Sequence, residues 1–149
     1  LSALNDFNYL PHRIELIESS NNINWYNDSK STNCASTKAA LECIDEKIIL
    51  ILGGSMKDMN YESLSSLINQ KVKLVIFIGE NKEYIKSQLK IITKTIDAKS
   101  IESAVEISLS HSLANDNVLL SPASPSFDMF KNYEERGAAF ISAVQNIVK

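Results

Sequence analysis

The sequence contains few cysteines and histidines, and it has no internal repeat or low-complexity segment. Cys34 and Cys43 are the only cysteines, and their spacing matches neither a redox pair nor a zinc knuckle. The two histidines, His12 and His111, show no metal-ligand spacing with each other or with the cysteines. The sequence therefore predicts reduced thiols and no metal site.

A strong charge of either sign is also absent. The formal net charge is −3 over 149 residues, so the chain has no basic footprint for nucleic acid and no polybasic stripe for a membrane. No apolar stretch is long enough to span a bilayer, and the N-terminus lacks the charged region and apolar core of a signal peptide. These absences predict a cytoplasmic protein that binds neither nucleic acid nor membrane.

The composition that remains is that of an ordinary globular domain. Hydrophobic residues make up 44% of the chain and charged residues 22%, and the length suffices to bury a core. The first residue is Leu1 rather than Met, so we expect a piece of a longer protein. Leu1–Leu10 has no clear period and ends at Pro11. Residues 1–10 are predicted to be a hinge or linker, and residues 11–149 the domain.

Apolar runs alternate with helical patterns along the chain. Two short alternating segments, Ile14–Glu18 and Ile23–Tyr26, flank turn residues and predict a hairpin. The further strands are predicted at Ile48–Leu52, Val72–Ile78, Thr95–Ala98 and Asn117–Ser121, with helices at Tyr61–Ile68, Lys82–Ile92 and Ser100–Leu113, after Asn33 and from Phe130. This order predicts an α/β domain with a mainly parallel sheet and an antiparallel N-terminal hairpin.

Polar loops follow three of the predicted strands, at Asn27–Asn33, Gly53–Asp58 and Ser121–Ser126. Ligands of such sheets bind beyond the carboxyl ends of the strands, so we expect the loops to converge on one cleft. In the first loop, Lys30 offers a point charge to a phosphate or carboxylate, and Asp28 can accept a ribose hydroxyl. A capped polar loop without a ligand explains these residues equally well.

The second and third loops carry their own candidates. Gly53–Asp58 does not match the Walker phosphate loop, and by itself it indicates a turn with a solvated lysine. Ser126 is a favoured capping residue ahead of the last helix, and Asp128 suits its first turn. A hydroxyl beside the free N–H groups of a helix start can form a binding site for a carboxylate or phosphate. An ordinary capped helix is an equally supported alternative.

Four motifs carry a resemblance to a known family. SPASPSFDMFKNYEERG at Ser121–Gly137 resembles the C-terminal signature of the Mur ligases, most closely of the branch that adds D-glutamate. NDSKSTN at Asn27–Asn33, GGSMKD at Gly53–Asp58 and LPHR at Leu10–Arg13 resemble other segments of these ligases, in the same order. The resemblance spans essentially the whole chain. The chain departs from the usual pattern at Tyr9, Met56, Asp58, Ser124, Pro125 and Tyr133.

The resemblance implies a Rossmann-like three-layer sandwich, the fold of a Mur ligase C-terminal domain. It also implies that Thr32 and Lys57 hold the α-carboxylate of D-glutamate. By the same resemblance, the side-chain carboxylate is held by Ser126 and by the backbone around Phe127 and Tyr133.

The nucleotide side is likewise implied by the resemblance. Arg13 and Asp28 would bind ATP, and Lys30 would bind ATP and act as the catalytic residue.

Glu134 and Glu135, two adjacent carboxylates near the C-terminus, point in different directions on a helix, so they are predicted to be solvated and not catalytic.

For the full-length protein, the resemblance implies an ATP- and Mg²⁺-dependent ligase of peptidoglycan precursor synthesis, monomeric, that joins D-glutamate to UDP-N-acetylmuramoyl-L-alanine. ATP and Mg²⁺ would be bound mainly by a missing central domain, so the isolated chain is expected to be inactive. Two alternatives stay open. One is a domain of a sister amide ligase, either another Mur ligase or folylpolyglutamate synthase, and the other is a stand-alone anion-binding α/β module.

Overall fold

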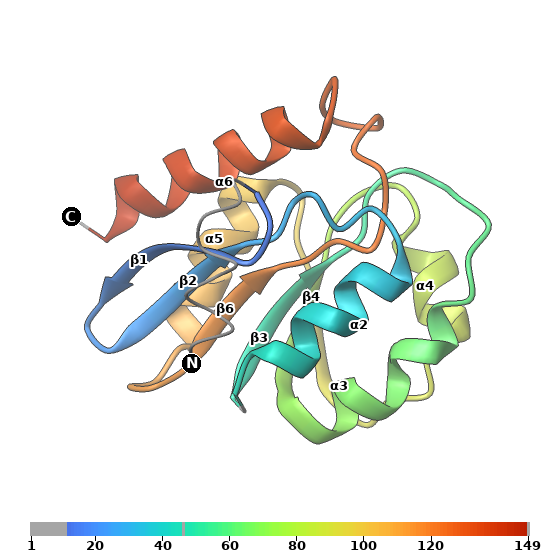
Figure 1. The fold of residues 1–149 in the computed structure, drawn as a ribbon, viewed down its shortest axis with the longest axis horizontal. Coiled ribbons are helices and arrows are strands. Elements are labelled where there is room, and N and C mark those ends of the chain that lie inside the picture. The colour runs from blue at the N-terminus through green and yellow to red at the C-terminus, as the bar shows by residue number, and fades with distance from the viewer. Residues whose placement is uncertain (1–11, 46, 149) are drawn as a thin grey trace.

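The computed structural model describes residues 12–45 and 47–148. The predicted hinge over residues 1–10, and with it Tyr9, lies outside the described residues, as do Leu10 and Pro11 of the LPHR motif. The strands are β1 (Glu15–Ser20), β2 (Ile23–Asn27), β3 (Ile48–Leu52), β4 (Val72–Phe77), β5 (Lys94–Asp97) and β6 (Asn117–Leu120). They form one sheet in the order β1-β2-β6-β3-β4-β5 (Figure 1).

The sheet is mixed, as predicted. Strands β1 and β2 pair antiparallel, and each of the other neighbouring pairs is parallel. Asn21 and Asn22 form the turn of the hairpin with positive φ angles of 55° and 63°, a conformation that asparagine tolerates better than most residues. The hairpin therefore supplies the antiparallel edge of an otherwise parallel sheet.

Helices cover both faces of the sheet (Figure 1). The helical elements are α2 (Cys34–Cys43), η1 (Tyr61–Leu64), α3 (Ser65–Lys71), α4 (Lys82–Gln88), α5 (Ile101–His111) and α6 (Tyr133–Ile147). The first four pack on one face and α5 and α6 on the other, and each face has its own apolar core. In β3, Leu50 belongs to one core and Ile49 to the other, which explains the continuous apolar run. The predicted three-layer α/β sandwich is confirmed.

One predicted helix is shorter than its pattern indicates. Helix α4 ends at Gln88, whereas the apolar period continues to Ile92. The backbone N–H of Lys90 donates to Ser65 Oγ (2.9 Å), and that of Ile92 donates to Asn69 Oδ1 (3.0 Å). Side chains of α3 thus take the donors that would have continued the helix, and Ile92 is left 95% exposed. Among the described helices, none is long and apolar enough to cross a membrane.

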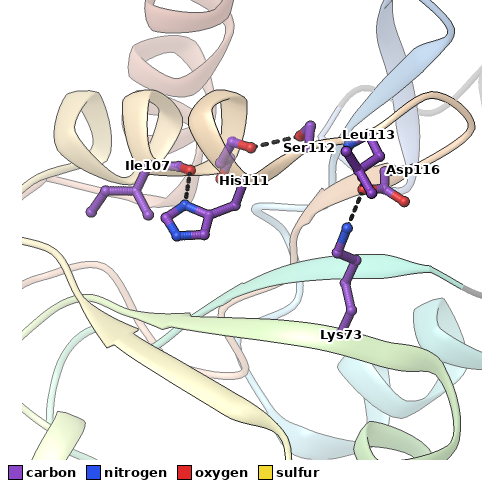
Figure 2. Close-up of polar contacts among 7 residues, drawn as sticks. Lys73, Ile107, His111, Ser112, Leu113 and Asp116 are labelled. Carbon is purple, nitrogen blue, oxygen red and sulfur yellow. Dashed lines mark hydrogen bonds and ion pairs between the residues drawn. The ribbon is translucent and has the colours of Figure 1, made fainter.

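At the end of the sheet opposite the polar loops, polar contacts connect β4, the end of α5 and the segment before β6 (Figure 2). Lys73 Nζ forms an ion pair with Asp116 Oδ2 (2.6 Å), and the N–H of Leu113 donates to the same carboxylate (2.8 Å). At the end of α5, His111 Nδ1 lies 2.9 Å from the carbonyl oxygen of Ile107. These contacts fix the connection from α5 to β6 and give His111 a local structural role.

Candidate functional site

The three polar loops meet at one edge of the sheet because β2, β6 and β3 are neighbours. The backbone N–H of Asp28 donates to Leu120 O (2.8 Å), and that of Gly53 donates to Pro122 O (2.9 Å). The three loops therefore meet, as predicted. The prediction of one shared cleft was wrong, because the loops pack against one another and the described residues line separate hollows.

Those hollows separate the predicted site residues into two groups. Arg13 is half-buried and lines a hollow against α2 together with Asp28. Lys57 is exposed and lines a different hollow with Met56, Asp58 and Tyr84, whose hydroxyl donates to Asp58 Oδ1 (3.1 Å). Arg13 and Asp28, two of the residues expected to bind ATP, thus line a different hollow from the lysine expected to hold the α-carboxylate.

Asp28 is the centre of the first loop. It is 1% exposed, its Oδ1 accepts from the N–H of Ile14 (3.1 Å), and its Oδ2 accepts from the hydroxyls of Ser31 and Ser121 (2.7 Å for Ser121). Burial raises the pKa of Asp28 from 3.8 to about 6, although these hydrogen bonds act in the opposite direction. The carboxylate therefore connects the first loop to the third loop and to Ile14, the residue just before β1.

The raised pKa of Asp28 predicts a pH-dependent difference in stability. Between about pH 4 and 6 the folded state binds more protons at Asp28 than the unfolded state does, so its contribution to stability falls as pH rises. An Asp28→Asn variant lacks this proton but keeps an acceptor for Ile14, and the serine hydroxyls can turn to accept from its amide. We expect the stability of the wild type relative to Asp28→Asn to fall by roughly 2 to 3 kcal/mol from about pH 4 to 7.

Urea unfolding of both proteins across this pH range measures the difference. Asp45→Asn is the matched control, because Asp45 is exposed and its replacement should give no such trend. A wild-type stability that follows Asp28→Asn at every pH would contradict a raised pKa at Asp28.

Arg136 bonds the first loop to the third and lies close to the second, and the sequence interpretation missed it. It is 1% exposed, and its guanidinium donates to Ser29 Oγ (2.9 Å), Ser29 O (2.7 Å) and Ser124 O (2.9 Å). Burial lowers the pKa of Arg136 to about 10, so it stays charged at neutral pH. Gly54 of the second loop lies so close that an added Cβ would come within 3.2 Å of Arg136 Nη1. The one signal in the sequence is that Arg136 lies on the stripe of Phe140 and Val144, at helical spacing.

Ser126 does not cap the last helix, so that prediction was wrong. Helix α6 begins at Tyr133, and its cap is Asn132, whose side chain accepts from the N–H of Glu135 (2.8 Å). The carbonyl of Ser126 instead closes a turn by accepting from the N–H of Phe130 (2.8 Å). The Ser126 side chain is 2% exposed, and its hydroxyl has no hydrogen-bond partner among the described residues. A buried hydroxyl without a partner is costly and is uncommon in native proteins.

His12, three residues before β1, packs against the start of α6. Gly137 interrupts the apolar stripe of that helix because a Cβ there would lie 2.2 Å from His12 Nδ1. The His12 ring packs edge-on against the Tyr133 ring, with centroids 6.2 Å apart, and the His12 carbonyl accepts from the N–H of Lys30 (2.9 Å). Tyr133 is held further by its carbonyl, which accepts from Ser29 Oγ (2.6 Å). His12 of the first motif and the start of the last helix thus form one packed unit.

The remaining predicted residues lie at the surface of this unit. Lys30 is exposed and Thr32 is half-buried, both in the first loop, and Phe127 is 73% exposed beside Ser126. Glu134 and Glu135 are exposed, as expected. In the described part of the chain, no three His, Cys, Asp or Glu side chains gather in a way that could hold a metal ion.

Several proteins of known sequence are similar to this chain. A family model described as "Mur ligase, glutamate ligase domain" matches residues 12–124. The chain is 45% identical to the UDP-N-acetylmuramoylalanine–D-glutamate ligase of Geotalea uraniireducens, covering 99% of this chain and 32% of that protein. It is 43% identical to the ligase of the same name from Aquifex aeolicus, covering 94% of this chain and 34% of that protein. The chain thus spans about a third of the length of these relatives.

Solved structures share the fold at lower identity. The murein peptide ligase Mpl of Psychrobacter arcticus is 17% identical with a TM-score of 0.64, covering 93% of this chain and 31% of that one. The MurF ligase of Thermotoga maritima, in complex with ADP, is 13% identical with a TM-score of 0.61 and the same coverage of both chains. The match to the family model over most of the chain therefore shows that this chain belongs to the Mur ligase family, as its glutamate ligase domain.

Proposed function

We propose that this chain is the substrate-binding domain of the ligase that adds D-glutamate to UDP-N-acetylmuramoyl-L-alanine. Relatives with the corresponding name match nearly the whole chain. The structural observation that carries the proposal is a hydrogen bond between two loops. The N–H of Ser55, in the loop of Lys57, donates to Pro125 O (2.8 Å), in the loop of Ser126. One loop presents an exposed ammonium and the other a buried hydroxyl without a described partner.

The two loops suit the two carboxylates of D-glutamate. Lys57, with Thr32, would hold the α-carboxylate, because a lysine offers a full charge and a threonine a hydroxyl donor. Ser126 would hold the side-chain carboxylate together with the backbone around Phe127 and Tyr133. Because Ser126 is covered in the structure, its hydroxyl would reach the ligand through a small movement of the turn that it closes with Phe130.

Asp28 and Lys30 of the first loop would face ATP. The Lys30 side chain is exposed and could approach a phosphate oxygen as the catalytic cation, and Arg13 lines a hollow together with Ser31, the residue after Lys30. Asp28 lines the same hollow, but its carboxylate is 1% exposed and accepts from three internal donors, so a ribose hydroxyl would reach it only after a movement of the loop. Mg²⁺ would accompany ATP and be held mainly by the rest of the full-length protein. Residues 1–10 would form the hinge toward it.

The proposed reaction has two steps. ATP transfers its terminal phosphoryl group to the carboxylate of UDP-N-acetylmuramoyl-L-alanine, which gives an acyl phosphate and ADP. The amine of D-glutamate then attacks the acyl carbon, an amide C–N bond forms, the C–O bond to phosphate breaks, and the amine loses a proton. This domain would contribute by positioning the amine, an effect that can lower a barrier by about 7 to 11 kcal/mol in the best model systems. We also propose that the full-length enzyme is a monomer and that it acts in the cytoplasm, where ATP is available.

Phosphate release by the full-length protein that contains this chain tests the proposal. ATP and UDP-N-acetylmuramoyl-L-alanine are supplied with D-glutamate, L-glutamate, L-lysine or meso-diaminopimelate in turn, and release is expected with D-glutamate alone. The isolated chain is the control and should release none. Release with another amino acid would assign the chain to a sister amide ligase. If none of the four supports release, the ligase proposal is wrong and the anion-binding module becomes the better interpretation.

A further inference from the structure

A buried asparagine between β4 and α4 contacts the second loop through three hydrogen bonds. Asn81 is fully buried. Its Oδ1 accepts from the N–H of Gly54 (2.9 Å), its N–H donates to Gly54 O (3.2 Å), and its Nδ2 donates to Ser55 O (3.1 Å). Two residues further along that loop is Lys57. The asparagine therefore fixes the base of the loop from which Lys57 projects.

The same asparagine reaches the third loop. Asn81 Nδ2 lies 2.9 Å from Ser124 Oγ and 3.2 Å from Tyr61 Oη, and these two hydroxyls lie 2.9 Å apart. Tyr61 Oη also donates to Ala123 O (3.0 Å). The protons can be assigned consistently: Asn81 donates to Ser124 Oγ, Ser124 donates to Tyr61 Oη, and Tyr61 donates to Ala123 O.

This network acts on a stiff segment. Pro122 and Pro125 enclose Ala123 and Ser124, and Ala123 has a positive φ of 53°, so the segment has few alternative conformations. Ser124 and Tyr61 are fully buried, so their hydrogen bonds are not exchanged with water. Ser126 follows this segment directly. The base of its loop is therefore held at a fixed distance from the base of the Lys57 loop.

We infer that Asn81, Tyr61 and Ser124 are positioning residues that select the chain length of the dicarboxylic amino acid. The inference rests on the proposed function, in which Lys57 and Ser126 hold the two carboxylates of one substrate. Because the bases of the two loops are held at one distance, a substrate with one methylene more or fewer requires a larger movement of the Lys57 side chain and of the turn after Ser126. Such a difference in fit can change specificity by about 10 to 200-fold. Loosening the network lets the separation vary and reduces this discrimination.

The test compares kcat/KM for D-glutamate, D-aspartate and D-2-aminoadipate in the full-length protein. Tyr61→Phe removes only the hydroxyl, and Ser124→Ala removes the second hydroxyl with a smaller change in volume. We expect the preference for D-glutamate over D-2-aminoadipate to fall by about fivefold or more in each variant, the factor that one neutral hydrogen bond represents. Tyr26→Phe is the matched control, because Tyr26 is a buried tyrosine of β2 outside the network, and its preference should stay that of the wild type.

The ratio separates positioning from stability. A variant that is merely less stable loses active enzyme and lowers kcat/KM for all three substrates by the same factor. Unchanged ratios in both Tyr61→Phe and Ser124→Ala would overturn the inference. Absence of D-glutamate-dependent phosphate release in the wild type would be a different result, because it contradicts the proposed function, and the inference would fall with it.

Discussion

Replacing Arg136 by leucine should lower the free energy of unfolding by about 3 to 5 kcal/mol, since it leaves several buried acceptors without a donor. The carbonyls of Ser29 and Ser124 are fully buried, and each accepts one hydrogen bond from the guanidinium. Leucine fills part of the space but supplies no donor. Each buried acceptor left without a donor costs about 1 to 3 kcal/mol, so the losses add up to a large fraction of the roughly 5 to 15 kcal/mol that stabilises an ordinary domain.

Urea unfolding of the chain measures this loss. Arg136→Lys should fall between the wild type and Arg136→Leu, because an ammonium keeps the charge but lacks the planar fork that reaches two loops at once. Lys131→Leu is the control, since Lys131 is exposed just before α6 and its replacement should have little effect. A loss below about 1 kcal/mol in Arg136→Leu would show that the three loops hold together without it.

The second large effect is expected at Lys57. In the full-length protein, Lys57→Ala should raise the KM for D-glutamate about a hundredfold, as expected from the loss of one charged hydrogen bond to a carboxylate. The KM for ATP should stay close to that of the wild type, because Lys57 lies apart from the hollow lined by Arg13 and Asp28. Thermal stability should not change either, since the Lys57 side chain is exposed.

Steady-state kinetics with D-glutamate and ATP varied in turn give both constants. Lys38→Ala is the matched control, because Lys38 is an exposed lysine of α2 and its removal should leave both constants unchanged. A D-glutamate KM that is the same in Lys57→Ala and the wild type would refute the assignment of Lys57 to the α-carboxylate.

Most of the fold was predictable because periodicity and burial report directly on backbone structure. The apolar run Ile48–Leu52 predicted β3 with its observed bounds, since a strand covered on both faces has no polar side. Ser100 caps α5 by accepting from the N–H of Ser103 (3.0 Å), as a serine ahead of an apolar stripe suggests. The end of α4 was not predictable, because the side chains that stop it belong to α3.

The loops of the candidate site could be predicted from the sequence, but the buried residues that hold the loops together could not. Lys57 and Ser126 stand out because they follow buried strands, whereas the bonds of Asn81 and Arg136 connect residues distant in sequence. Ser126 was misassigned because Ser126, Asp128 and Asn132 are all of the types that favour the cap position and all precede the stripe of α6, and Asn132 is the nearest. A charged or amide side chain at a position that the pattern buries is the signal that could have found Arg136.

The backbone hydrogen bonds between the loops have a consequence for the entropy of binding. The donors at Asp28, Gly53 and Ser55 pair with carbonyls of the segment from Leu120 to Pro125, so the bases of the loops are ordered when the chain folds. Their conformational entropy is then lost before any ligand arrives, and association has less freedom left to remove. Any movement that binding requires is therefore expected at the exposed end of Lys57 and in the turn after Ser126. The ends of the strands beneath them move as one body.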